Sequence, residues 1–213
     1  MTLQDLIGLY RAQAQDDRQP YFCSDELLTI YANEAQMQAC RRGQLLRRRV
    51  LLNYAPGQES VAMPEDAIAC LRARDADTEV QLWDVHRMDA SMPNWQRDGA
   101  RGAVQFLVSG LETDRLYLWP RPGASGQVDM VVSRMAKPMR AMSDVPEVRP
   151  EGHAALVQWM LYRAFCRGDT ELFNERKAAL ALAEFEREFG RASSLRNETW
   201  LRDGQGMMPG PIA

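Results

Sequence analysis

The sequence is poor in the residues that build catalytic and metal sites. Its 213 residues include only two histidines and four cysteines. The cysteines stand singly, with no CxxC pair and no nearby histidine that would complete a metal site. They are Cys23, Cys40, Cys70 and Cys166. We therefore expect reduced thiols, no bound metal and no other cofactor.

An excess of positive charge and long apolar runs are also missing. Lysine and arginine total 26 against 29 acidic residues, which gives a formal net charge of -3. An autonomous nucleic-acid-binding domain usually carries a basic excess, so any contact with DNA should be local. No stretch approaches the roughly 18 apolar residues that span a bilayer, and the N-terminus lacks the pattern of a secretory signal. We expect a soluble chain with no membrane partner.

Recognisable catalytic motifs are absent as well. A serine or cysteine nucleophile generally needs a base, and we interpret the two candidates, His86 and His153, as structural or surface residues. The segment 204–206, Gly-Gln-Gly, has neither a strand before it nor a helix after it, as a phosphate-binding loop requires. We predict that the chain is not an enzyme. A carboxylate-based cell-wall hydrolase stays open as an alternative, because two of the acidic residues could lie at the required separation.

Helical periodicity marks the first part of the chain. Thr2 and Asp5 match a capping box, and an apolar stripe with helical spacing follows them to Ala14. Ser24 has the position of a second helix cap, and Gly43 that of a helix stop. The sequence therefore predicts a helical hairpin.

Helical periodicity returns after a proline-rich connector. Residues 153–167 are apolar almost all round, which predicts a helix buried on more than one side. We expect Asp169 or Thr170 to cap a further helix that ends at Gly190. The apolar positions that we expect to line this helix are Leu172, Phe173, Leu180, Leu182, Phe185 and Phe189.

Between the helices, from Arg47 onward, the pattern changes to the period of two that is typical of strands. Alternation predicts strands at 50–54, 61–63, 104–108, 116–119 and 128–132. Residues 78–88 predict a longer strand whose apolar phase slips between Leu82 and Trp83, as a bulge or a two-sided strand requires. Residues 67–74 fit either a helical turn or a strand. With no helices expected between them, these strands favour an antiparallel sheet or small sandwich.

The order of elements predicts an α+β protein. We assign residues 1–46 to the N-terminal helical hairpin and 47–148 to a β-rich insertion. Residues 149–190 form the C-terminal helix pair, and 191–213 form an extended tail.

Two segments are candidates for binding a partner. One is a basic run that comprises Arg41, Arg42, Arg47, Arg48 and Arg49. It fits either charge at a helix end followed by a solvated strand, or a basic patch that faces DNA phosphates or an acidic partner. The other is the tail, which is either a frayed terminus or a segment that orders on meeting a partner. Its candidate anchors are Trp200, Leu201, Met207, Met208 and Ile212.

Four segments follow one another along the chain. They are SDELLTIYANEAQMQACRR at 24–42, LNYAPGQESVAMPEDAIACLRARD at 52–75, DRLYLWPRPGASGQVDMVVSRMAKPM at 114–139, and HAALVQWMLYRAFCRGDTELFNERKAALALAEFEREFG at 153–190. In this order they resemble the head-to-tail adaptor proteins of tailed bacteriophages. They match a helix with an Asn-Glu-Ala centre, a strand and turn before a Met-Pro step, a strand ending in an aromatic residue and proline, and a terminal helix pair.

The resemblance implies a helical bundle, formed by the helices of both ends, with a β-rich insertion. It implies a ring, commonly of twelve subunits, around the DNA channel, with the C-terminal segment reaching the portal protein. The expected partners are the portal, a tail or nozzle component, further copies of the chain and, without sequence preference, the genomic DNA. The expected location is the neck or tail of the virion, after synthesis in the host cytoplasm. A stopper or tail-terminator ring protein and a DNA-binding module are the remaining alternatives.

Overall fold

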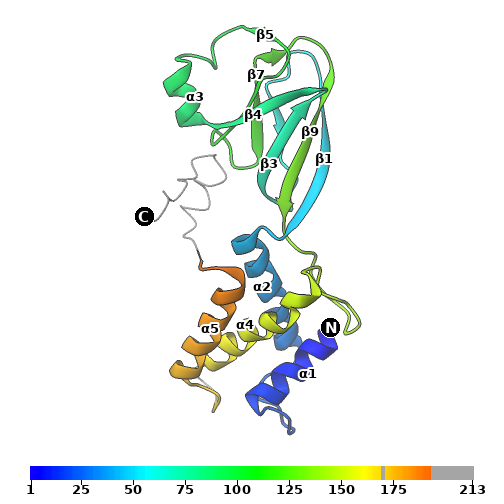
Figure 1. The fold of residues 1–213 in the computed structure, drawn as a ribbon, viewed down its shortest axis with the longest axis vertical. Coiled ribbons are helices and arrows are strands. Elements are labelled where there is room, and N and C mark those ends of the chain that lie inside the picture. The colour runs from blue at the N-terminus through cyan, green and yellow to red at the C-terminus, as the bar shows by residue number, and fades with distance from the viewer. Residues whose placement is uncertain (169–170, 193–213) are drawn as a thin grey trace. The chain divides into compact units, whose positions relative to one another are not determined.

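The computed structural model describes residues 1–168 and 171–192 and divides them into two compact units (Figure 1). The helical unit comprises Met1–Leu46 and Met135–Ala192, and the strand-rich unit comprises Arg47–Arg134. The chain is thus a mixed α+β protein, as the order of its sequence patterns predicted. Of the predicted tail, residues 193–213 lie outside the described residues.

Four helices form most of the helical unit. They are α1 (Leu3–Ala14), α2 (Asp25–Gly43), α4 (His153–Phe165) and α5 (Glu175–Phe189), with a short 3-10 turn at Pro150–Gly152 before α4. The predicted caps of the first two helices are confirmed, because Thr2 and Asp5 form a reciprocal capping box and Ser24 accepts from the N–H of Leu27. Gly43 is the last helical residue, and Gln44 then takes the left-handed conformation.

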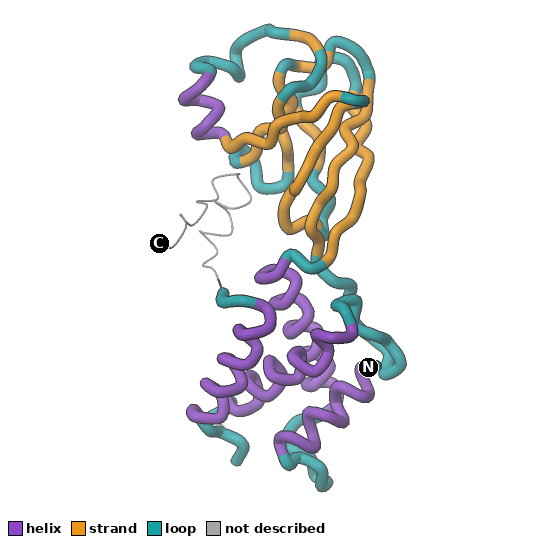
Figure 2. The backbone as a smooth tube through the Cα atoms, in the orientation of Figure 1, coloured by secondary structure: helices purple, strands orange, loops and turns teal. Residues whose placement is uncertain are grey.

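Helix α4 has the central place in this unit. It packs against α1, α2 and α5, all of which lie within the purple helical part of Figure 2. Its buried side chains include Leu156, Val157, Met160 and Leu161, which face different directions around the helix axis. The prediction of a helix buried on more than one side is confirmed.

Helix α5 begins later than the sequence indicated. Asn174 caps it by accepting from the N–H of Lys177, so the predicted caps at 169–170, which lie outside the described residues, are not its start. The buried face consists of Ala178, Ala181, Phe185 and Phe189. Phe173 and Leu180, which we expected on this face, are 48% and 61% exposed. Leu180 lies off the buried stripe of the helix, and Phe173 precedes the cap of the helix.

The connector after the strands belongs to the helical unit, although we had assigned residues up to 148 to the insertion. Asn33 on α2 exchanges two hydrogen bonds with the backbone of Met139, at 2.9 and 2.7 Å. The N–H of Leu3 donates to the carbonyl of Asp144 at 2.8 Å. Backbone N–H groups in the first turn of a helix have no acceptor within that helix, and for α1 the connector supplies one.

The strand-rich unit contains a seven-stranded sheet with the order β1-β9-β3-β4-β6-β7-β2. Its strands are β1 (Leu46–Tyr54), β2 (Ser60–Ala62), β3 (Ala67–Asp75), β4 (Thr78–Asp84), β6 (Phe106–Ser109), β7 (Arg115–Trp119) and β9 (Gly126–Arg134). Two-residue strands β5 (Arg101–Gly102) and β8 (Arg121–Pro122) pair separately. The segment 67–74, which fitted two interpretations, is therefore a strand.

The sheet is not purely antiparallel, since β4 and β6 run parallel. A parallel pair needs a crossover, and the chain supplies one that contains α3 (Val85–Ser91). The predicted strand over 78–88 is therefore wrong beyond Asp84. Asp84 caps α3 by accepting from the N–H of Arg87 at 3.0 Å, which ends the strand there.

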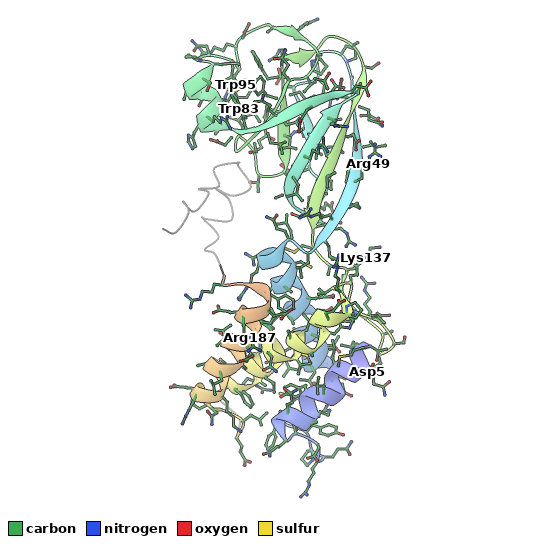
Figure 3. The ribbon with its side chains drawn as sticks, viewed as in Figure 1. Asp5, Arg49, Trp83, Trp95, Lys137 and Arg187 are labelled. Carbon is green, nitrogen blue, oxygen red and sulfur yellow. The ribbon has the colours of Figure 1, made fainter. Side chains whose placement is uncertain are left out.

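The phase slip in β4 has a direct structural cause. Leu82 packs against the main core of the sheet, whereas Trp83 packs against a second cluster beside α3. That second cluster is built on Met88, Trp95 and Phe106, and Figure 3 shows Trp83 and Trp95 beside α3. Both faces of β4 are thus covered, so the two-sided interpretation is correct.

Candidate assembly surfaces

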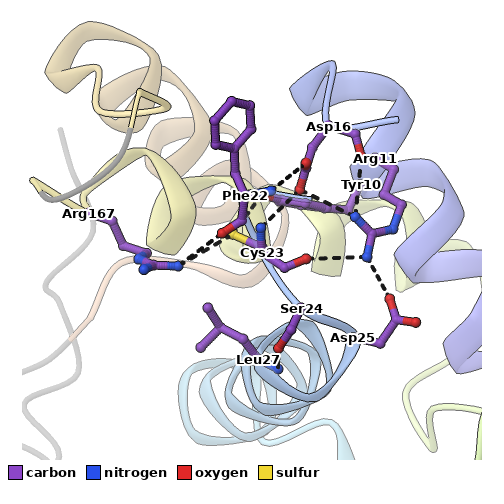
Figure 4. A network of polar contacts seen from close by, with 9 residues as sticks. All are labelled: Tyr10, Arg11, Asp16, Phe22, Cys23, Ser24, Asp25, Leu27 and Arg167. Carbon is purple, nitrogen blue, oxygen red and sulfur yellow. Dashed lines mark hydrogen bonds and ion pairs between the residues drawn. The ribbon is translucent and has the colours of Figure 1, made fainter. Parts of the chain in front are cut away.

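The connection between α1 and α2 is held by a buried carboxylate. The side chain of Asp16 is fully buried and accepts hydrogen bonds from the backbone N–H groups of Phe22 and Cys23, at 2.8 and 3.1 Å (Figure 4). It also forms an ion pair with Arg11 at 3.3 Å. A buried carboxylate is tolerated when hydrogen bonds and a cation satisfy it. Asp16 therefore fixes the path of the loop.

Arg11 and the end of α4 extend this network. Arg11 donates to the carbonyl of Cys23 and to Asp25, at 3.2 and 2.6 Å, and Arg167 donates to the carbonyl of Phe22 at 3.4 Å (Figure 4). The hydroxyl of Tyr10 donates to Cys23 Sγ at 3.3 Å. Burial, and then this bond, raise the pKa of Tyr10. We had not assigned Asp16 a role, because an aspartate in a polar connection carries no sequence signal of burial.

The basic run is divided between the two units. Arg41 and Arg42 lie in the last turn of α2. The side chain of Arg42 is only 4% exposed, pairs with Glu186 at 3.5 Å and donates to the carbonyl of Gly190 at 3.2 Å. Its guanidinium also lies over the rings of Trp159 and Phe185. Arg42 therefore joins α2 to α5 and presents little charge to a partner.

The other three arginines lie on β1. Arg48 forms an ion pair with Asp66 at 2.6 Å, and Arg49 binds both carboxylate oxygens of Asp129, at 2.7 and 2.6 Å. The hydrogen bond from Arg49 lowers the pKa of Asp129, which keeps that carboxylate charged. Arg47 is exposed and has no ion-pair partner among the described residues. Figure 3 shows Arg49 at the outer side of β1.

The tail candidates lie outside the described residues. Trp200, Leu201, Met207, Met208 and Ile212 are all within 193–213. The described chain ends its last helix at Phe189, with Gly190 at a positive φ of 87° directly after it. Such a glycine is a common end of a helix.

Comparison with known proteins identifies the family. The family model described as SU10 adaptor protein matches residues 1–209. This chain belongs to the SU10 adaptor protein family. The family is one of phage head-to-tail adaptors, which are structural proteins, so the resemblance that the sequence segments indicated is confirmed. No curated protein matches the chain.

One of the two histidines of this adaptor has a structural role. His153 is buried at the start of α4, where its Nε2 lies 2.7 Å from the carbonyl of Val148 and its Nδ1 lies 3.1 Å from the amino group of Met1. His86 is exposed on α3. In the described part of the chain, no three histidine, cysteine or acidic side chains are grouped so that they could hold a metal ion.

Four described carboxyl groups of the adaptor have pKa shifts opposite in direction to that of a hydrolase's general acid. The pKa values of Asp5, Glu26, Asp129 and Asp144 are all lowered by hydrogen bonds. A general acid needs the opposite, a raised pKa.

Among the helices described, none is both long and apolar enough to cross a bilayer.

Proposed function

We propose that this adaptor forms a ring beneath the portal protein and links it to a tail or nozzle component around the DNA channel. The observation that carries the proposal is the family match over residues 1–209, which includes both units and most of the tail. A ring of twelve subunits is the stoichiometry that we propose. The site of action is the neck or tail of the virion, where the adaptor lies close to the genomic DNA.

Side-by-side association needs two different surfaces on each copy, because a ring is built from heterologous contacts. The helical unit offers apolar residues for such contacts on separate helices. Ile30 and Met37 lie seven residues apart on α2 and are 54% and 39% exposed, and Leu180 on α5 is 61% exposed. Fully burying an exposed side chain of this kind contributes roughly 1.5–3 kcal/mol, and because these are about half exposed, burying each between copies would contribute about half of that. Repetition around the ring would make these small contributions cooperative.

The basic residues of β1 support a local role near DNA or an acidic partner. Arg47 is the member of the run that has no described ion-pair partner, whereas Arg48 and Arg49 already have carboxylate partners. We expect each arginine that neutralises a phosphate to add affinity that falls with salt. Arg42 is excluded from this surface by its burial.

The tail is the segment that we propose to dock on the portal. Deleting residues 191–213 should leave the circular dichroism of the helices unchanged, because α5 ends at Phe189. The truncated chain should no longer bind portal rings in co-sedimentation or negative-stain images. The paired change Trp200→Ala and Leu201→Ala should weaken loading, and the matched change Asn197→Ala and Glu198→Ala should not. Normal loading of the truncated chain would refute tail docking.

A further inference from the structure

The two end strands of the large sheet face one shared groove within the strand-rich unit. β1 and β2 stand at opposite ends of the strand order, so each has one hydrogen-bonded neighbour within the described sheet. A groove of about 540 Å³ is nevertheless lined by Arg48–Leu52 of β1 and by residues 62–65, which begin at the end of β2. The sheet therefore curls until its ends approach each other across an open seam. We call this groove the seam.

The core of the sheet is incompletely covered at the seam. Val50, Leu52 and Met63 pack against the main core but are only half-buried. In contrast, Val61 is 3% exposed, and the core residues of β9 are fully buried. Leu51 is 51% exposed at the same edge. A further strand placed along the seam would cover the half-buried side chains and satisfy the free backbone groups of β1.

A second cavity adjoins the seam. It has a volume of about 250 Å³, and Met63 lines both spaces. One part of its wall is apolar, with Ile68, Cys70, Leu82, Leu107 and Leu116, and the other part is polar, with Ser109, Glu112, Thr113 and Arg115. Burial raises the pKa of the Cys70 thiol to about 11, as expected in an apolar setting. A cavity of about 150 Å³ suffices for benzene, so this one has room for a larger ring such as indole.

We propose that the seam binds an extended segment of a partner protein as an added β-strand, with a large apolar side chain of that segment in the cavity. Strand addition takes affinity from main-chain hydrogen bonds and specificity from pockets that receive alternate side chains. The segment should therefore be apolar at alternate residues. It should also carry an acidic residue near one end, opposite Arg47.

Charge complementarity supports the acidic end. Charged residues on an edge strand hinder unwanted pairing with other strands. On β1 the arginines occupy only positions 47–49, and the later exposed residues Leu51 and Asn53 carry no charge. Arg48 and Arg49 are engaged by Asp66 and Asp129. The positive charge of Arg47 is thus the one at this edge that a bound segment would neutralise.

The test uses the full-length chain and a fluorescein-labelled peptide, Val-Thr-Trp-Thr-Val-Glu, in an anisotropy titration. We expect saturable binding. Replacing tryptophan by glycine, or methylating alternate backbone nitrogens, should weaken binding at least tenfold, because the first empties the cavity and the second blocks the ladder. Absence of saturable binding, or equal affinity for the N-methylated peptide, would overturn strand addition.

A protein variant tests the cavity separately. Cys70→Phe fills the space behind Met63 and should weaken binding at least tenfold, whereas Cys166→Phe adds the same ring at an exposed position on the other unit and should leave it unchanged. Equal affinities of the two variants would overturn the cavity assignment. If Cys70→Phe does not fold, the two modified peptides decide the question on the unaltered chain. The assay contains no portal, so its result is independent of the proposed ring.

Discussion

Replacing Asp16 by alanine should destabilise the helical unit strongly. Its carboxylate accepts hydrogen bonds from two backbone N–H groups and forms an ion pair with the Arg11 guanidinium, and the Asp16 side chain is fully buried. A buried donor without an acceptor costs roughly 1–3 kcal/mol, and breaking a buried ion pair from one side costs roughly 3–5 kcal/mol. Because both figures count the same donors, they are not added, and we expect the free energy of unfolding to fall by about 4 kcal/mol. That is a large share of the roughly 5–15 kcal/mol that stabilises a domain.

Asp16→Asn should lose about half as much, because it keeps one oxygen acceptor but gives up the charge. The free energy of unfolding is measured by urea titration, followed by circular dichroism at the helical minimum. This signal reports mainly the helical unit, which contains α1, α2, α4 and α5.

The matched control is Asp17→Ala, which removes the neighbouring, exposed carboxylate and should change the free energy of unfolding by less than about 0.5 kcal/mol. If the free energy of unfolding of the Asp16→Ala variant lies within about 0.5 kcal/mol of that of this control, the buried carboxylate does not hold the loop. The argument that the network fixes the path from α1 to α2 would then fail.

Two further perturbations follow from the same unit. Hydrogen bonds from the N–H groups of Ala141 and Arg140 lower the pKa of Asp144 from 3.8, so its contribution to stability is present above that value and is lost as pH falls through the lower folded pKa. Carboxyl NMR titration should give a midpoint below 3.8, and Asp144→Asn should remove that part of the acid dependence. Arg42→Ala should cost roughly 1–3 kcal/mol in urea titration, and Arg187→Ala, at an exposed i,i+3 pair, less than about 0.5 kcal/mol; equal losses would contradict the structural role of Arg42.

Local signals in the sequence were sufficient for the starts of α1 and α2 and for most strands. The capping box at Thr2 and the cap at Ser24 depend on residues within three positions, so they can be predicted without tertiary structure. Helix α3 was missed because its seven residues are too few for a clear period, and its apolar contact is with β6, about twenty residues later. The parallel pair was missed for the same reason, since a crossover was not expected there.

The basic run shows why sequence alone could not locate the binding surface. The change from helical to strand periodicity falls at Leu46 and Arg47, where the chain passes from one unit to the other. It gave no information on the acidic partners, which come from segments far along the chain: Asp66 for Arg48, Asp129 for Arg49 and Glu186 for Arg42. Each pairing offsets part of the positive charge that a partner can meet, and burial removes Arg42 altogether. Five arginines that form one patch in the sequence thus leave Arg47, at the edge of the seam, as the charge on β1 that is open to a partner.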